Sequence, residues 1–368
     1  MSGKIKNTGR KSCSIRELAA HIGLSTCTVS KVLNDRAGKK IPKETQERVL
    51  AAARELNYVP NVNAQRLFQR RSGVIGLLVP ARPIAPGNVF GDSHFVDILS
   101  GMEPLLEESG HHLMLLFRNE ERRPDETYAR LFRAGTIDGL LIWGTVPEST
   151  LCAELEADSL PYLFITCRPP DLAPEAVNWV ASDYRASARE VTSAMLRAGC
   201  RKLLYLAGPE NSSVAAEMRR GVDDALAGTG VGLSSRSSLY TPGEARKVAL
   251  DALRREPFDG ILNVSRDMAP GILDAAAELG LDGGNFRMAT IDCAASRPRL
   301  SCELATGLAD DLAIGRAAIE SLLELIGGKT ARVGKRIPGC TVLNPRFFPE
   351  AAVSSPWPAG PAFPAVRG

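Results

Sequence analysis

Apolar residues near the start of the chain recur at the spacing of an amphipathic helix. Across residues 15–22 they fall three and four positions apart, which places them on one helical face. Ser14 precedes this run and Glu17 follows it by three residues, the arrangement of a capping box that begins a helix. Gly23 stands where a left-handed residue commonly ends a helix. The pattern predicts a first helix between Ser14 and Gly23.

A second short helix is predicted directly afterwards. A single residue separates the glycine from Ser25, a suitable N-cap for residues 26–34. The apolar face of this helix consists of Val29, Val32 and Leu33. Two short helices joined by so tight a glycine-containing turn are typical of a helix-turn-helix.

A third helix is predicted over residues 43–57. Its apolar positions are Val49, Leu50, Ala53 and Leu56, which again share one face. We expect this face to pack against the first two helices and complete a small three-helix core.

In a helix-turn-helix the second helix enters the major groove of DNA, and its first residues reach base edges. Here these residues are Ser25, Thr26, Cys27 and Thr28, with Lys31 one turn later. Threonine methyls suit the thymine methyl, hydroxyls suit phosphates or base edges, and a lysine can reach guanine acceptors. A helical hairpin that packs on something other than DNA is the alternative interpretation.

Residues 62–71 can form one more helix, too short to be stable alone. This segment carries Arg66, Arg70 and Arg71 and one prominent apolar residue, Leu67. A segment that folds on DNA and inserts an apolar side chain between base pairs of the minor groove has these features. Without the preceding helices it would be interpreted as a basic linker.

From Gly73 onward, short apolar runs alternate with helical patterns. The runs predict strands at residues 74–80, 112–117, 139–143 and 162–166, with helices at 98–108 and 127–133 between them. Pro104 is expected to kink the first of these helices. The alternation starts again with strands at residues 202–208, 260–264 and 288–292. Apolar strands separated by helices indicate parallel sheets covered on both faces.

Two such halves in succession predict two lobes with a cleft between them. In open parallel sheets, ligands bind beyond the carboxyl ends of the strands, and in a two-lobed core those ends face the cleft. The predicted fold is an N-terminal all-α helix-turn-helix head and hinge helix, followed by an α/β two-lobed core with parallel sheets.

Charge is divided unevenly along the 368 residues. The net charge is +3, yet residues 1–72 hold 15 Lys and Arg against 5 Asp and Glu, which leaves 30 against 37 for the remainder. The head is therefore +10 and the body −7. A basic head on an acidic body is typical of a polyanion-binding module attached to a domain that does not bind nucleic acid. This asymmetry favours DNA over a protein partner for the predicted helix-turn-helix.

Several other classes of function lack their signatures in this sequence. There is no Gly-x-x-x-x-Gly-Lys-Ser/Thr loop, Gly-x-Ser-x-Gly elbow, His-Glu-x-x-His motif or Cys-x-x-Cys pair. No metal, cofactor or catalytic residue is predicted, and the chain is not expected to be an enzyme. The basic N-terminus is not followed by the apolar stretch of a signal peptide, so a cytoplasmic protein is expected.

The head closely resembles the DNA-binding head of the lactose-repressor-like (LacI/GalR) family. The resemblance lies in the runs Ser-Ile-Arg-Glu-Leu-Ala, Thr-Val-Ser-Lys-Val-Leu-Asn, Thr-Gln-Glu-Arg-Val, Leu-Asn-Tyr-Val-Pro-Asn and Ala-Gln-Arg-Leu between residues 14 and 67. It implies that Thr26, Cys27 and Lys31 determine which operator sequence the protein recognises. It also implies that Leu67 is the hinge leucine that kinks the operator. The loop at residues 35–40 is about two residues longer than in the best-known members, and Pro42 replaces a frequent serine cap.

Residues 73–345 look like the periplasmic-binding-protein-type core of the same family. The segments that carry this resemblance are Asp-Tyr-Arg-Ala-Ser-Ala-Arg from residue 183, and Leu-Ala-Gly-Pro from residue 206 with the two serines and the glycine that follow. Positions that commonly bind an effector have changed: Met218 replaces an Arg, Ser265-Arg266 an Asn-Asp pair, and Cys167-Arg168 an Asp-Arg pair. Asp292 keeps a family aspartate.

These replacements bear on the class of effector. Arg266 and Arg168 favour an anionic or carboxylate-bearing ligand, unless a protein carboxylate such as Asp292 neutralises Arg266. Trp143, at a strand end, can stack on a sugar ring or another planar ligand. Each residue also has a purely structural interpretation, with Met218 in the core, Arg266 in a salt bridge and Trp143 packed between lobes.

The predicted organisation is a helix-turn-helix domain (1–58), a hinge helix or linker (59–72), a two-lobed effector-binding and dimerisation domain (73–348) and a tail expected to be disordered (349–368). The predicted DNA contacts are Ser14, Ser25, Thr26, Cys27, Thr28, Ser30, Lys31, Asn34, Tyr58, Asn61, Asn63, Ala64, Arg66 and Leu67. The predicted effector contacts are Trp143, Arg168, Ser213, Met218, Tyr240, Ser265, Arg266 and Asp292.

These residues predict a homodimeric transcriptional regulator, a repressor, that binds operator DNA under the control of a sugar, sugar acid or sugar phosphate. The alternative is a solute-binding or sugar-processing protein with a vestigial basic extension.

Overall fold

The computed structural model describes residues 13–33, 40–58, 71–79, 89–117, 127–144, 149–281, 287–298, 300–329 and 331–349. The chain divides into two compact units, Met1–Ser72 and Gly73–Gly368, which we call the head and the body. The predicted hinge contacts Asn61, Asn63, Ala64, Arg66 and Leu67, the predicted contact Asn34 and the tail from residue 350 lie outside the described residues.

The head contains the three predicted helices: α1 (Ile15–Ile22), α2 (Thr26–Leu33) and α3 (Lys43–Glu55). The capping box is present, because the Ser14 hydroxyl accepts from the Glu17 amide and the Glu17 carboxylate accepts from the Ser14 amide. Gly23 ends α1 in the left-handed region, with φ 66°. The two helices of the helix-turn-helix are thus fixed at both sides of their turn.

The core of the head differs in detail from the prediction. Leu18, Val29 and Val49 are fully buried, one from each helix. Leu50 was expected in this core but is exposed, and Ala52 is buried instead. The α3 helix also ends at Glu55 rather than at Asn57, whose φ of 47° is not helical.

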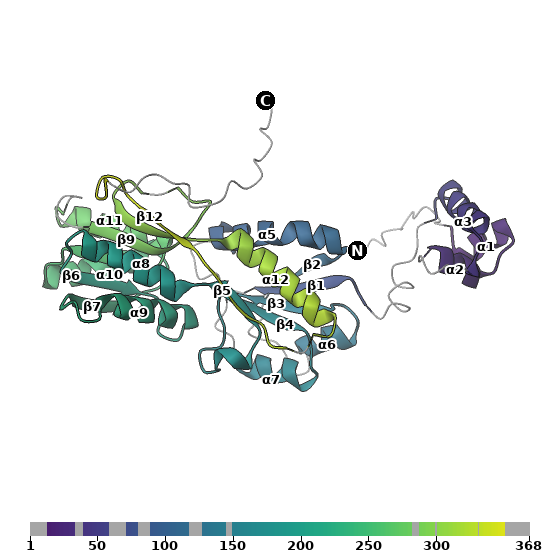
Figure 1. Cartoon of the computed structure of the whole chain (residues 1–368), viewed down its shortest axis with the longest axis horizontal. Helices are drawn as coiled ribbons and strands as arrows, with labels where there is room; N and C mark the ends of the chain where they lie inside the picture. Colours follow the sequence, from purple (N-terminus) through teal and green to yellow (C-terminus); the bar gives the residue numbers. More distant parts are fainter. Residues whose placement is uncertain are drawn as a thin grey trace, which may run out of the picture. The chain divides into compact units, whose positions relative to one another are not determined.

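The body contains two six-stranded sheets, one in each lobe (Figure 1). The first sheet has the order β11-β5-β4-β3-β1-β2, and its paired strands are parallel. Its strands are β1 (Val74–Val79), β2 (His112–Phe117), β3 (Gly139–Trp143), β4 (Tyr162–Ile165), β5 (Trp179–Ser182) and β11 (Gly334–Ile337).

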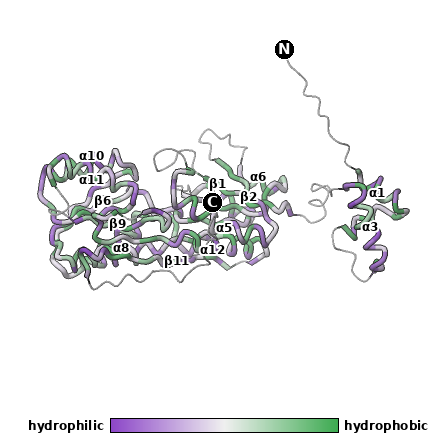
Figure 2. Tube along the Cα trace, turned by 90° about the horizontal axis from the view of Figure 1, so that it is seen from above, coloured by the Kyte–Doolittle hydropathy of each residue, from purple (hydrophilic) through white to green (hydrophobic). Residues whose placement is uncertain are grey.

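The second sheet repeats this plan with the order β12-β10-β9-β8-β6-β7, in which only β12 is antiparallel to its neighbour. Its strands are β6 (Lys202–Ala207), β7 (Gly232–Ser237), β8 (Gly260–Asn263), β9 (Arg287–Ala294), β10 (Glu303–Ala309) and β12 (Cys340–Leu343). The predicted doubled parallel α/β fold is therefore confirmed. The central strands β1 and β6 are apolar and largely buried. Hydrophobic stretches run through both lobes (Figure 2).

Helices cover the sheets of both lobes. The first lobe has η2 (Val89–Gly91), α5 (Ser93–Ser109), α6 (Tyr128–Arg133), α7 (Ser149–Ala157), η3 (Pro174–Ala176) and α12 (Asp311–Ile326). The second lobe has α8 (Tyr184–Arg197), α9 (Ser213–Leu226), α10 (Pro242–Arg255), η4 (Arg266–Met268) and α11 (Ala269–Glu278). The α5 helix starts five residues before its predicted start, because Asp92 caps it, and it continues through Pro104.

The chain passes between the lobes at β5–α8, at β10–α12 and at β11–β12. Aspartates cap the helices at the first two passages. Asp183 accepts from the Ala186 amide at 3.1 Å, and Asp310 accepts from the Ala313 amide at 2.9 Å. The start of α12 is therefore fixed at the junction of the lobes.

The α5 and α12 helices approach each other closely at two glycines. A Cβ atom on Gly101 would lie 2.1 Å from the Leu312 carbonyl oxygen, and one on Gly315 would lie 2.0 Å from the Ile98 carbonyl oxygen. Only glycine allows backbones to approach so closely. The contact places the first residues of α12 beside Ile98 and Gly101 in the middle of α5.

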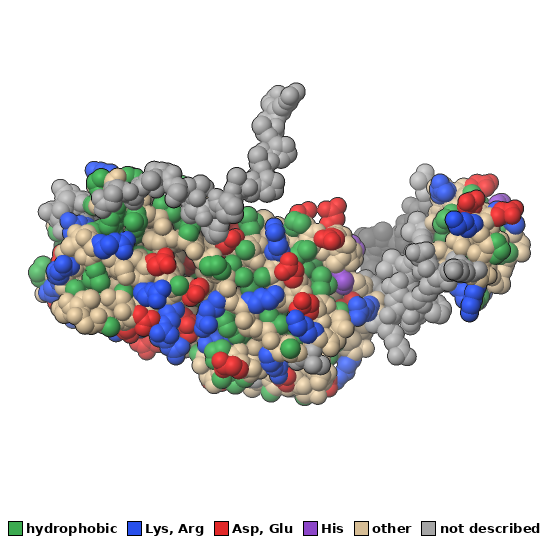
Figure 3. Space-filling view, viewed as in Figure 1, with side chains coloured by type: hydrophobic (Ala, Val, Ile, Leu, Met, Phe, Trp, Pro, Cys, Tyr) green, Lys and Arg blue, Asp and Glu red, His purple; other side chains and the backbone are tan. Residues whose placement is uncertain are grey.

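The body is not a uniformly charged surface. On the face shown in Figure 3, Lys and Arg side chains are interspersed with Asp and Glu. Ion pairs such as Arg185–Asp224 and Arg332–Glu156 account for this mixture. Within the described residues, no helix is long and apolar enough to cross a membrane.

Candidate functional site

The second helix of the head presents its predicted DNA contacts to solvent. Thr26, Cys27 and Lys31 are exposed, whereas Val29 and Val32 on the opposite face are buried in the head core. The helix is therefore divided into an inward apolar face and an outward face of mixed chemistry. The outward face is the one that a base pair can reach.

Two of the predicted contacts also hold the helix end in place. The Ser25 hydroxyl accepts from the Thr28 amide at 3.1 Å and lies 2.9 Å from the Thr28 hydroxyl. Ser14 has the same capping role in α1. Ser30 and Tyr58 are half-buried. Ser25 and Thr28 thus order the N-terminus of α2, where free backbone amides favour an anion such as a phosphate.

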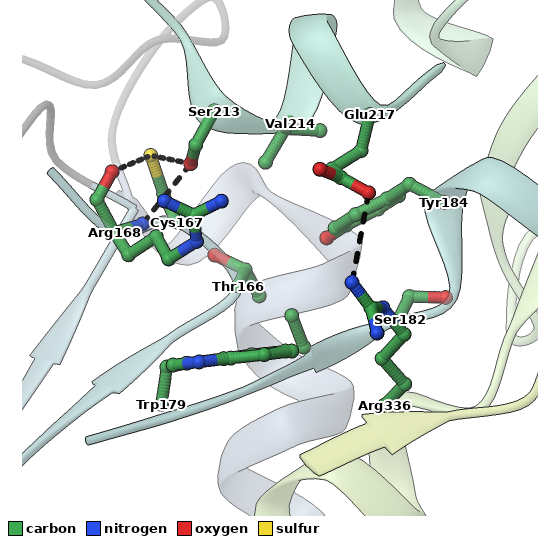
Figure 4. Close-up of a pocket in the computed structure, with 11 residues that line it drawn as sticks. Thr166, Cys167, Arg168, Trp179, Ser182, Tyr184, Ser213, Val214, Glu217 and Arg336 are labelled. Atoms are coloured by element: carbon green, nitrogen blue, oxygen red, sulfur yellow. Dashed lines mark hydrogen bonds and ion pairs between the residues drawn. The ribbon is translucent and has the colours of Figure 1, made fainter. Parts of the chain in front are cut away.

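A pocket in the body is lined by residues of both lobes (Figure 4). The first lobe contributes residues at the end of β4 and on β5 and β11, namely Thr166, Cys167, Arg168, Trp179, Ser182 and Arg336. The second lobe contributes residues of α8 and α9, namely Tyr184, Ser213, Val214 and Glu217. Arg336 lies 3.8 Å from Glu217 across this pocket. Polar side chains that line the pocket therefore make contacts between the two lobes.

Ser213 makes the tightest connection in this pocket. Its hydroxyl accepts from the Arg168 amide at 3.1 Å and lies 3.4 Å from the Cys167 sulfur. Ser212 caps the same helix by accepting from the Ala215 amide. The N-terminus of α9 is therefore aimed at the strand end that carries Cys167 and Arg168.

A second polar group at the lobe junction has His94 at its centre. The Nδ1 atom of His94 lies 2.8 Å from the Asp311 carboxylate, and its Nε2 atom lies 3.8 Å from the Asp292 carboxylate. Asp92 and Tyr184 also belong to this group by their electrostatic interactions. Burial, followed by the charges of Asp292 and Asp311, raises the pKa of the Tyr184 hydroxyl well above its usual range.

Some predicted effector residues contribute polar groups to the interlobe region. Arg168 and Ser213 line the pocket, and Asp292 faces His94. Tyr240 is half-buried, and its hydroxyl lies against Gly208 at the end of β6. Burial raises the pKa of this hydroxyl, so it remains protonated and able to donate.

Other predicted effector residues make contacts with neighbouring parts of the protein. Met218 is in the hydrophobic core, as its structural interpretation held. Trp143 is buried and packs on Phe95 with ring centroids 4.8 Å apart. Ser265 caps η4 by accepting from the Asp267 amide. These contacts account for Met218 and Ser265, whereas the buried indole N–H of Trp143 has no hydrogen-bond partner among the described residues.

Of the two arginines that favoured an anionic effector, Arg266 is paired with a carboxylate, whereas the Arg168 guanidinium is hydrogen-bonded, in the described part of the chain, only to backbone carbonyls. Arg266 donates to Glu303 at 3.0 Å and to the Pro298 carbonyl at 2.7 Å. Arg168 donates to the Leu172 carbonyl at 2.9 Å. Of the two partners considered for Arg266, the structure has a protein carboxylate, which is Glu303 and not Asp292.

Sequence reasoning missed His94, Asp92 and Asp311. Apolar periodicity placed the start of α5 at residue 98, which left His94 outside any predicted element. The Asp-Ser-His-Phe run is a possible N-cap, and this local signal would have moved the helix start to include His94. The approach of Asp311 has no local signal, because it depends on the α5–α12 contact.

Two family patterns match this chain. Residues 14–61 match the bacterial regulatory proteins of the lacI family, and residues 72–255, half of the chain, match the periplasmic binding proteins and sugar-binding domain of the LacI family. The chain belongs to the LacI family. It is accordingly a DNA-binding transcriptional regulator with a helix-turn-helix head and a periplasmic-binding-protein-like body.

Curated relatives of this LacI-family chain are named as regulators. The ribose operon repressor of Halalkalibacterium halodurans is 28% identical over 73% of this chain and 76% of its own length. The transcriptional regulator MalR of Streptococcus pneumoniae is 22% identical over 85% of this chain and 92% of its own length.

Solved structures share the fold. The lac repressor dimer bound to operator and the anti-inducer ONPF has a TM-score of 0.73 at 22% identity, over 90% of this chain and 98% of that one. The regulator CelR in complex with cellobiose has a TM-score of 0.64 at 21% identity, with the same coverage.

Proposed function

We propose that this LacI-family protein is a cytoplasmic, homodimeric repressor without enzymatic activity, whose operator affinity is controlled by a small ligand held between the lobes. The observation that carries the proposal is the joining, in one chain, of a complete helix-turn-helix to a two-lobed body. The exposed face of α2 supplies the DNA contacts, and the interlobe polar groups supply the ligand contacts.

Dimerisation follows from the size of the DNA-binding element. One helix-turn-helix reads only a few base pairs, and two related by two-fold symmetry read a near-palindromic site. The proposed specificity residues are Thr26, Cys27 and Lys31, which lie exposed on α2. The proposed hinge contacts around Leu67 add a minor-groove contribution.

We propose a neutral, hydroxyl-rich effector in place of an anionic one. The case for an anion depended on Arg266 and Arg168 in the cleft. Arg266 is neutralised by the Glu303 carboxylate, and Arg168 donates to the backbone carbonyl of Leu172. Asp292 and the phenols of Tyr184 and Tyr240 are suited to hydrogen bonds with hydroxyl groups. Relatives named as ribose and sucrose operon repressors, and the CelR–cellobiose complex, support a sugar.

The DNA part of the proposal is tested by selection from a pool of random duplexes with the full-length chain. We expect enrichment of one near-palindromic site, and we expect affinity to fall steeply between about 50 and 200 mM salt because the basic head releases counterions. Recovery of no common sequence, or affinity indifferent to salt, would contradict it.

The ligand part is tested by thermal shift with ribose, sucrose and cellobiose against sugar acids and sugar phosphates. A ligand that binds the folded state raises its melting temperature. We expect stabilisation by a neutral sugar, and a matching change in operator affinity. Stabilisation by acids or phosphates alone would contradict the assignment of a neutral effector.

A further inference from the structure

His94 lies at the junction of three parts of the body. It is near the start of α5 in the first lobe, and its Nδ1 atom is 2.8 Å from the carboxylate of Asp311. Asp311 begins α12, directly after the chain has returned from the second lobe. The Nε2 atom of His94 points to Asp292, on β9 of the second lobe, at 3.8 Å. One imidazole ring thus spans the passage between the lobes.

The charged groups around this ring are mostly carboxylates. Asp92 is the N-cap of α5, Asp311 comes from α12 and Asp292 from β9. Beyond Asp92 lies Asp267 of η4, which is already paired with Arg297. Among the described residues, the carboxylate of Asp292 has His94 as its ion-pair partner and makes no hydrogen bond. A charged imidazole is therefore the cation that balances these carboxylates.

The ionisation of these groups is coupled. Burial by itself lowers the pKa of His94, but the charges of Asp311, Asp292 and Asp92 together raise it well above its usual range. Burial raises the pKa of Asp292 to about 6, against the opposing effect of His94. At neutral pH the favoured state has a charged His94 that faces an ionised Asp292.

A second contact joins the same elements. The Ser296 amide, in the turn after β9, donates to the carboxylate of Asp97 on α5 at 3.4 Å. The start of α5 and the end of β9 are thus connected at two points, His94 and Asp97. A loss of the charged imidazole would weaken this polar contact between the lobes.

We propose that His94 is a positioning residue that is held in the first lobe by Asp311, links that lobe to Asp292 of the second lobe and keeps Asp292 ionised, so that lobe association and ligand capture depend on its protonation. The ligand-capture part rests on the proposed function, because it assumes that the effector reaches Asp292. Protonated His94 holds β9 against α5 and α12. Neutral His94 leaves Asp292 without its counter-charge, and the carboxylates then repel one another across the lobe junction.

The sign of the pH dependence follows from linkage. A histidine with a raised pKa in the folded state stabilises that state fully below its unfolded value of about 6.5, and the contribution is lost as the pH rises through the folded value. The raised pKa of Asp292 affects stability at lower pH. As the pH rises from about 4 to about 6, the free energy of unfolding falls, because the unfolded state ionises this acid more readily than the folded state does. The His94 contribution can therefore be distinguished from that of Asp292, because it is lost at higher pH.

The first test follows the NMR signals of the histidine imidazole rings in the full-length chain as the pH is changed. The sequence has 4 histidines, so the imidazole signals are few, and His94→Gln identifies its signal by loss. We expect His94 to titrate at the highest pH of the four, and Asp311→Asn and Asp292→Asn each to lower its midpoint. A His94 midpoint equal to that of the exposed His112, in both wild type and Asp311→Asn, would overturn the proposal.

The second test reads the link between the lobes by amide hydrogen exchange in residues 92–97 and 287–298. After correction for intrinsic rates, we expect faster exchange in both segments in His94→Gln at about pH 6, and a smaller difference at about pH 9. His112→Gln is the matched control and should leave both segments unchanged. Equal exchange in wild type and His94→Gln at both pH values would overturn the proposal.

Asp311→Asn provides a second variant should His94→Gln fold poorly, because it keeps the shape of the side chain and a hydrogen bond to the ring. Its exchange difference should follow the same pH dependence, and exchange equal to wild type at about pH 6 would overturn the proposal. Neither test uses DNA or an effector. A failure here therefore leaves the repressor assignment standing, and a failure of operator selection leaves the His94 linkage standing.

Discussion

The Arg266 guanidinium donates to the Glu303 carboxylate at 3.0 Å, inside the second lobe. Both side chains are nearly removed from solvent, at 10% and 1% exposure. Glu303 also accepts from the hydroxyls of Thr290 and Thr306. The pair is therefore part of a buried polar network that fixes β9 against β10, and it takes Arg266 out of the set of residues available to an anion.

Arg266→Ala is expected to destabilise the body and leave operator sequence preference unchanged. Removing one partner leaves an uncompensated buried charge, which costs about 3–5 kcal/mol. Thermal or denaturant unfolding of the full-length chain measures this cost. The matched control is Arg255→Ala, which breaks an exposed pair with Asp251 and should cost less than about 1 kcal/mol. Equal costs for the two variants would show that the Arg266 pair has no special weight.

The sequence predicted the apolar strands well and the polar ones poorly. Strands β1, β3 and β4 are buried along their whole length, so they consist of continuous apolar runs that can be recognised in the sequence. The edge strand β7 has the sequence Gly-Leu-Ser-Ser-Arg-Ser and is only half-buried, so it has no apolar run. The β11 strand joins β5 from the far end of the chain, which no local pattern can reveal.

The same limit applies to the candidate site. The outward face of α2 was predictable because helical periodicity separates Thr26 and Cys27 from the buried Val29. The partners of Arg266 and His94 were not predictable, because each is set by tertiary contact between segments far apart in the chain. The resemblance to a family located the cleft, but the pairing of its charges required the fold.

Ser14→Ala is expected to weaken the head. It removes the hydroxyl that accepts from the Glu17 amide at 3.2 Å, a loss that costs about 0.5–2 kcal/mol. Operator affinity should fall through lowered stability of α1, with the preferred sequence unchanged. The control is Glu17→Gln, which retains a side chain able to complete the capping box. A melting profile of the head indifferent to Ser14→Ala would show that the box is not a stabilising feature.

Thr26 and Cys27 are expected to determine which bases are preferred. Changing both to alanine should alter the half-site recovered from random duplexes, with a cost of about 1–3 kcal/mol for each good base contact that is lost. Cys13→Ala, a cysteine outside α2, is the control and should leave the half-site unchanged. Weakening of the double variant by the same factor on all sequences would reassign these residues as positioning contacts.

Leu67 lies outside the described residues, and its role as a minor-groove wedge remains a prediction. An apolar side chain inserted between base pairs compensates for lost stacking and holds the duplex bent. Leu67→Ala should therefore leave unfolding of the chain unchanged and reduce operator bending, measured by fluorescence transfer between labelled duplex ends. Leu50→Ala is a suitable control, because Leu50 is a leucine of the head with 42% exposure that would suffer the same truncation without a proposed DNA contact. Bending and affinity that are identical in wild type and both variants would exclude a wedge at Leu67, and the basic residues of the hinge would then contribute only phosphate contacts.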